Sequence, residues 1–154
     1  MVTVGSAISV FAAVVLMVVF CGGISWQMLL DFPSLVLLAV IVIPMLCVSG
    51  LGKDFLKAIS IAGSKKETTL VQINRSIEAV KLAMNTLLYS GIFMTLFSIM
   101  IIFGGQAREG VDAGTLLMNC EVAMITLVYA LALCLILLPV LAALKRRKID
   151  YIND

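Results

Sequence analysis

The chain has 154 residues, of which 62% are hydrophobic and 13% are charged, and its mean hydropathy is +1.17. This composition excludes an ordinary soluble domain and predicts an integral membrane protein. The 11 basic and 9 acidic residues give a net charge of +2, too small to indicate a nucleic-acid partner. The chain has no histidine, its four cysteines lie in apolar runs, and it contains no phosphate-binding or nucleophile motif. We therefore expect no metal site, no cofactor and no enzyme activity.

Four apolar segments predict four transmembrane helices, because about twenty apolar residues cross a hydrocarbon core of roughly 30 Å. We expect spans at about 4–23, 33–52, 82–103 and 116–144, with a short cytoplasmic segment at 53–81 and an outer loop at 104–115. The first segment has no basic flank and is longer than the apolar part of a signal peptide, so we expect it to remain as a helix. The fold class is all-α, a single multi-pass membrane domain.

The residues that follow the second span favour a short helix at the membrane surface, with Phe55, Leu56 and Ile59 on its apolar side. Two prolines fall inside spans. Pro44 and Pro139 are expected to bend the second and fourth helices, because proline lacks a backbone donor.

The third helix is expected to extend into the cytoplasm. Ser64 and Glu67 have the spacing of a capping box, and apolar residues then recur every three or four positions up to Met84. A helix that begins there and ends at Gly104 and Gly105 would be about 55 Å long, well beyond a roughly 30 Å core.

Basic residues predict the orientation. Six of the 11 lie between the second and third spans and four follow the fourth span, leaving only Arg108 on the other side. Because basic residues concentrate in cytoplasmic loops, both termini should be cytoplasmic.

Two stripes of small and weakly polar residues follow helical spacing in the third and fourth spans. They are Gly91, Thr95 and Ser98 in the third span, and Asn119, Ala123, Thr126 and Ala130 in the fourth. Such stripes either let two helices pack closely or line a pore, and the two uses are compatible. Thr95, Ser98, Asn119, Ala123, Thr126 and Ala130 are the candidate ion-path residues.

Glu121 lies outside these stripes, since it is about 140° around an ideal helix from Thr126. It either contacts a neighbouring helix or subunit, or lies at the outer headgroup level after a helix start near Ala113 that Asp112 caps. Asp31 faces the same outer side and is interpreted as a carboxylate that favours a helix start.

Five segments together resemble the MotA/TolQ/ExbB family, most closely its MotA branch, the A subunit of flagellar stators. Residues 29–36 (LLDFPSLV) are similar to the branch's FIDxPSLLIV, and 52–58 (GKDFLKA) to the amphipathic segment after it. Residues 91–95 (GIFMT) match its GxxGT position, and 123–130 (AMITLVYA) with 138–142 (LPVLA) resemble ALLTTLYG followed by FLPLA. The family's cytoplasmic domain is strongly shortened here.

This resemblance implies a homopentameric ring in the bacterial inner membrane. The ring would surround a dimeric single-span partner, similar to MotB, ExbD or TolR, that carries a membrane aspartate. Thr95 and Thr126 would line the path of H⁺ or Na⁺, whose flow would drive rotation or mechanical work.

Two other functions remain open from the residues alone. The chain could be a non-conducting structural or accessory scaffold that uses the helix after residue 67 as a docking surface. It could instead be a small autonomous proton-coupled transporter in which Glu121 carries the proton.

Overall fold

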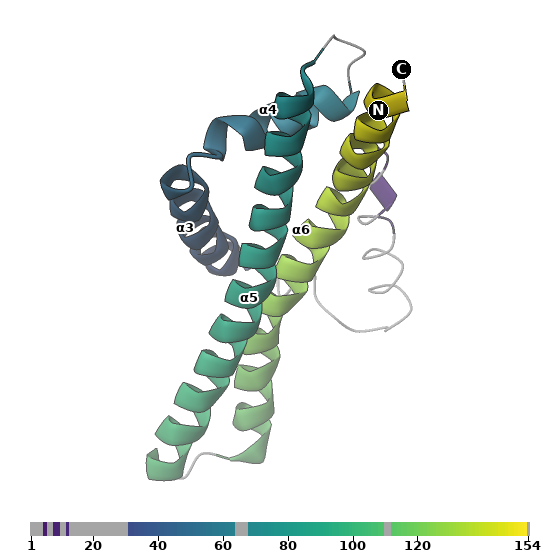
Figure 1. Ribbon diagram of the computed structural model, residues 1–154. Helices are drawn as coiled ribbons and strands as arrows, with labels where there is room; N and C mark the ends of the chain where they lie inside the picture. The colour runs from purple at the N-terminus through teal and green to yellow at the C-terminus, as the bar shows by residue number, and fades with distance from the viewer. Residues whose placement is uncertain are drawn as a thin grey trace.

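The structure, a computed structural model, describes residues 31–63, 68–109 and 112–153, together with the isolated positions 5, 8, 9 and 12. These residues form four continuous helices, α3 (Phe32–Val48), α4 (Gly52–Gly63), α5 (Leu70–Glu109) and α6 (Ala113–Asn153) (Figure 1). No strand occurs among them. The expected first span at 4–23 lies, except for those isolated positions, outside the described residues, as do Ser64 and Glu67 of the expected capping box.

Two of these helices are long and apolar enough to cross a membrane, over Leu70–Gly105 and Ala113–Ile152. The chain is therefore a membrane protein. Helix α3 has 17 residues, about 25 Å, and a bend of 101° separates it from α4. Among the described residues, a third span arises only if this bent pair is counted as one, so the four-span arrangement stays a prediction.

Helices α5 and α6 form a long antiparallel hairpin, α4 lies against one end of it, and α3 lies beside the same half, nearer the middle (Figure 1). The two stripes expected from the sequence meet in this hairpin. A Cβ atom added to Gly91 would lie 2.5 Å from Cβ of Ala130, and the Thr95 hydroxyl donates to the carbonyl of Ala123 at 3.2 Å. The close helix packing that the stripes allow is thus observed within a single chain.

A core of aliphatic side chains joins α4 to the end of the hairpin. The apolar seam expected on the third helix is confirmed, because Ile73, Ile77 and Val80 are buried there. They pack against Val140 and Leu144 of α6 and against α4.

Polar groups hold α4 in the same place. The Arg147 guanidinium of α6 donates to the carbonyl of Ile61 at 2.6 Å. The Ser76 hydroxyl of α5 donates to the carbonyl of Asp54 at 3.3 Å. Both ends of α4 are therefore tied to the hairpin.

The short helix expected directly after the second predicted span is present as α4, and Leu56 and Ile59, expected on its membrane-surface side, are not buried against the protein. Asp54, Ala58 and Ile61 face the protein, whereas Leu56 and Ile59 are 71% and 43% exposed. The small Ala58 side chain, fully buried, allows α4 to approach α5 closely. The larger apolar residues are left on the outer surface.

Helix ends differ from the sequence expectation at two places. Gly104 and Gly105 do not end the third helix. Neither glycine adopts a positive φ, and α5 continues through both to Glu109. Helix α3 ends at Val48, earlier than the expected 52, and the chain turns at Gly50, whose φ is +69°. That left-handed conformation favours glycine.

The start of α6 agrees with the sequence. Asp112 accepts hydrogen bonds from the Gly114 amide at 3.2 Å and the Thr115 hydroxyl at 2.6 Å, as an N-terminal cap. The Thr115 hydrogen bond lowers the pKa of Asp112 below its ordinary value. Pro44 and Pro139 lie inside the continuous helices α3 and α6.

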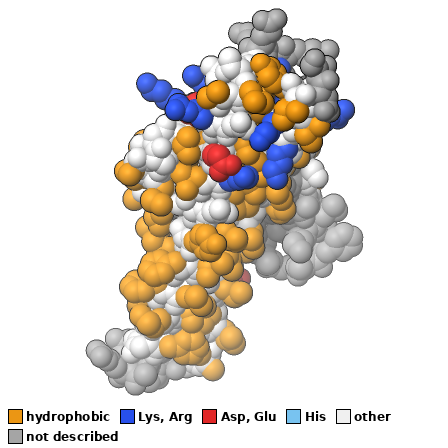
Figure 2. All heavy atoms as spheres, in the orientation of Figure 1, with side chains coloured by type: hydrophobic (Ala, Val, Ile, Leu, Met, Phe, Trp, Pro, Cys, Tyr) orange, Lys and Arg blue, Asp and Glu red, His pale blue; other side chains and the backbone are white. Residues whose placement is uncertain are grey.

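Charged side chains gather at one end of the molecule. Figure 2 shows the Lys and Arg side chains around the end that holds α4 and the last part of α6, and apolar side chains along the rest of the hairpin. The charged end corresponds to the two basic segments of the sequence, 53–81 and 145–148.

Replacing Gly91 by alanine should destabilise the hairpin, because the new methyl group would overlap Ala130. Overpacking of this kind typically costs about 1 to 3 kcal/mol, so the melting temperature in detergent should fall. Gly104→Ala is the matched control in the same helix, because a Cβ there meets nothing within 4 Å. Adding Ala130→Gly should restore part of the loss. An unchanged melting temperature in Gly91→Ala would contradict the close contact.

Candidate functional site

Thr126 lies at the middle of the apolar part of the hairpin. Along α6 it falls between Ala123 and Ala130, whose contacts on α5 are Thr95 and Gly91. Those two α5 residues lie midway along the apolar stretch 82–103. Groups that contact Thr126 are therefore remote from both ends of this stretch.

A cluster of polar side chains surrounds Thr126. The hydroxyl oxygens of Thr126 and Ser34 are 2.8 Å apart, and the Ser34 hydroxyl donates to the Asp31 carboxylate. The Asp31 amide also donates to the Tyr129 hydroxyl at 3.1 Å. We call these four residues the hydroxyl cluster.

The contacts within this cluster determine which hydroxyl donates to which acceptor. A serine hydroxyl has one proton to donate, and that of Ser34 goes to Asp31. Thr126 must then donate to Ser34, which gives a chain from Thr126 through Ser34 to the carboxylate. In such a chain the Ser34 hydroxyl both accepts, from Thr126, and donates, to Asp31.

Helix geometry explains why these residues meet. Asp31 directly precedes α3, and Ser34 follows it by three residues, which places the hydroxyl over the carboxylate in the first turn. Thr126 and Tyr129 are also three residues apart, so both point from α6 toward the start of α3. Ser34 and Thr126 are 4% and 7% exposed, and Asp31 is half-buried.

The candidate ion-path residues fall into two groups in the single chain. Buried at contacts within the chain are Thr95, Ala123, Thr126 and Ala130. Ser98 is half-buried and Asn119 is exposed. A side chain that lines a lumen between subunits is normally exposed in one subunit alone, so a path past Thr95 or Thr126 must follow the interior contacts of α3, α5 and α6.

The two acidic candidates, Glu121 and Asp31, lie at different levels of the hairpin. Glu121 is exposed on α6, between the hydroxyl cluster and the α5–α6 turn, and its role as a subunit contact or outer-rim residue stays a prediction. Asp31 was expected to face outward, but it lies beside Ser34 and Tyr129, because α3 begins at the level of Thr126. The sequence around Asp31 does not indicate that this residue would lie at the level of Thr126.

Ser34 and Tyr129 are the members of the cluster to which sequence reasoning assigned no role. Their spacing of three residues from Asp31 and from Thr126 is a visible signal that each pair shares a helix face. That the two pairs meet depends on the packing of α3 against α6, which local spacing does not contain.

No family model, curated protein or solved structure matches the chain.

Thr126→Val should weaken the cluster, because valine keeps the shape of threonine but removes the donor to Ser34. A typical hydrogen bond contributes about 0.5 to 1.5 kcal/mol, and the free energy of unfolding in detergent should fall by about that much. Thr126→Ser, which keeps the hydroxyl, should lose less.

A double-mutant cycle of Thr126→Val with Ser34→Ala measures the same bond. We expect a coupling of at least about 0.5 kcal/mol. Thr115→Val with Ser34→Ala is the control cycle, since Thr115 lies about 16 Å along α6 from Thr126 and should be additive. Additivity in the first cycle as well would contradict the Ser34–Thr126 contact.

Proposed function

We propose that this chain is a subunit of a membrane complex that uses the ion-motive force, and that it conducts protons through the hydroxyl cluster. Five copies would form a ring around two single-span helices of a partner that carries a membrane aspartate. The resemblance to the MotA branch supports this assembly, and ion flow past the ring would drive rotation or other mechanical work. The bacterial inner membrane is the location that this proposal requires.

One observation carries the conducting part of the proposal. The carboxylate of Asp31 lies with two buried hydroxyls at the middle of the apolar hairpin. An ionisable side chain at the depth of the bilayer interior is costly, so such residues usually serve a function. A carboxylate that exchanges a proton through Ser34 and Thr126 is such a function.

The order of donors favours H⁺ over Na⁺. Thr126, Ser34 and Asp31 form a continuous hydrogen-bonded chain, and a proton can move along it by exchange of donors and acceptors. Na⁺ would instead need these oxygens as ligands at the same time, and its binding would break the hydrogen bonds between them.

A non-conducting scaffold is the second candidate, and the burial of Thr95 and Thr126 favours it. Both hydroxyls have partners within the chain, as they would if their role were to hold the helices together. In a scaffold, the cluster would affect stability and have no effect on flux.

Proton flux separates these two functions. In vesicles containing the complex purified from its native membrane, Asp31→Asn and Thr126→Val should reduce dye-reported proton uptake on the order of tenfold or more, since each breaks the transfer chain. Thr126→Ser should retain most of the uptake. Glu121→Gln is the matched acidic control on the same helix, because Glu121 lies outside the cluster, and it should leave uptake unchanged.

The result that contradicts conduction is normal uptake in both cluster variants, provided that they assemble. Stoichiometry tests the assembly independently, because a five-fold ring around two foreign helices is expected in images of the native complex. A ring that contains only lipid would support the scaffold.

A further inference from the structure

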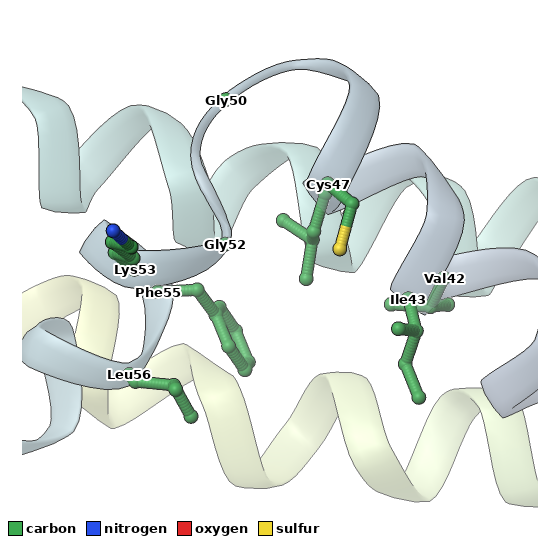
Figure 3. A pocket seen from close by; sticks show the side chains of 9 residues that line it. Val42, Ile43, Cys47, Gly50, Gly52, Lys53, Phe55 and Leu56 are labelled. Atoms are coloured by element: carbon green, nitrogen blue, oxygen red, sulfur yellow. The ribbon is translucent and has the colours of Figure 1, made fainter.

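A pocket of about 660 Å³ opens where α3 turns into α4 (Figure 3). Val42, Ile43 and Cys47 of α3 line one side, and Phe55 and Leu56 of α4 line the other. Figure 3 shows the Phe55 ring and the side chains of Ile43 and Cys47 directed into the same space. The size lies in the range of about 300 to 1,000 Å³ that is usual for small-molecule sites.

This pocket lies at the edge of the apolar part of the molecule. Its α4 wall packs against the stretch of α5 between Ile73 and Val80, which directly precedes Lys81 and the apolar stretch 82–103. Figure 2 shows the basic side chains at this end. In a membrane, the pocket would therefore open between the acyl chains and the headgroups.

The lining combines apolar walls with one positive charge. Lys53 is its only charged member among the described residues, and its side chain is exposed. Lys57 lies one turn further along α4 and is also exposed, whereas the side chain of Asp54 is buried and does not line the pocket. An apolar ligand with a negative group complements this arrangement.

The outer surface of α4 has the same character. Leu56 and Ile59 remain exposed beside Lys53 and Lys57, although α4 already buries another face against α5. Helices with apolar residues beside lysines bind at the level of anionic headgroups. The surface next to the pocket is therefore suited to the bilayer boundary.

We propose that the pocket binds one anionic phospholipid. An acyl chain lies between Ile43 and Phe55, and the phosphate contacts the Lys53 ammonium. A basic residue near an anionic leaflet contributes enough attraction to select such lipids over zwitterionic ones about fivefold. This binding is independent of proton conduction, because no member of the hydroxyl cluster lines the pocket.

Fluorescence quenching tests this site in the full chain. Phe55→Trp places a reporter in the pocket, and Trp26→Phe removes the single native tryptophan. The protein is reconstituted in phosphatidylcholine vesicles that contain a minor fraction of either brominated phosphatidylglycerol or brominated phosphatidylcholine. We expect phosphatidylglycerol to quench at about fivefold lower mole fraction.

Lys53→Gln should abolish this preference, whereas Lys145→Gln should keep it. Lys145 is the matched control, since it is an exposed lysine of α6 at the same end of the molecule and outside the pocket lining. Native mass spectrometry of the unmodified chain provides a second readout, in which phosphatidylglycerol should be retained preferentially.

Equal quenching by both lipids would show ordinary boundary contact and overturn the proposal. Absence of quenching would show that protein, such as a second copy of the chain, fills the pocket, and would also overturn it.

Discussion

The approach of Gly91 in α5 to Ala130 in α6 leaves no room for a side chain at position 91, because a Cβ there would lie 2.5 Å from its neighbour. Lipid tails are as apolar as the helices, so helices associate in a membrane mainly through close packing and interhelical hydrogen bonds. The small residues supply the close packing, and Thr95 supplies a hydrogen bond beside it. The remaining helices attach to the hairpin that this contact creates.

Placing α6 against α5 also determines what α3 meets. Leu38 packs with Leu87 and Ala130, and this contact brings the start of α3 to the level of Thr126. Polar groups without partners are costly in a bilayer, and here each hydroxyl finds a partner on another helix or on the adjoining turn. The same bonds that hold α3 in place also connect a carboxylate to the interior of the hairpin. Stability and proposed conduction therefore depend on the same atoms.

Local features of the sequence predicted much of this fold. The apolar seam from Ile73 to Val80 and the cap at Asp112 follow from periodicity and side-chain chemistry, and both are present. The end of α5 was wrongly expected at the two glycines, since glycine permits a helix stop without requiring one. The position of Asp31 beside Thr126 was not predictable, because it depends on contacts between residues more than ninety positions apart along the chain.

The lengths of α5 and α6 give the Gly91–Ala130 contact a mechanical meaning. The helices have 40 and 41 residues, so each is a continuous rod of about 60 Å. The contact between Gly91 and Ala130 lies near the middle of both rods. A small rotation at this pivot would move the charged end and the outer turn in opposite directions, while the centre stays nearly still. Arg147 ties the charged end of α6 to α4, so a displacement of α4 would turn α6 about this pivot and move the α5–α6 turn the opposite way.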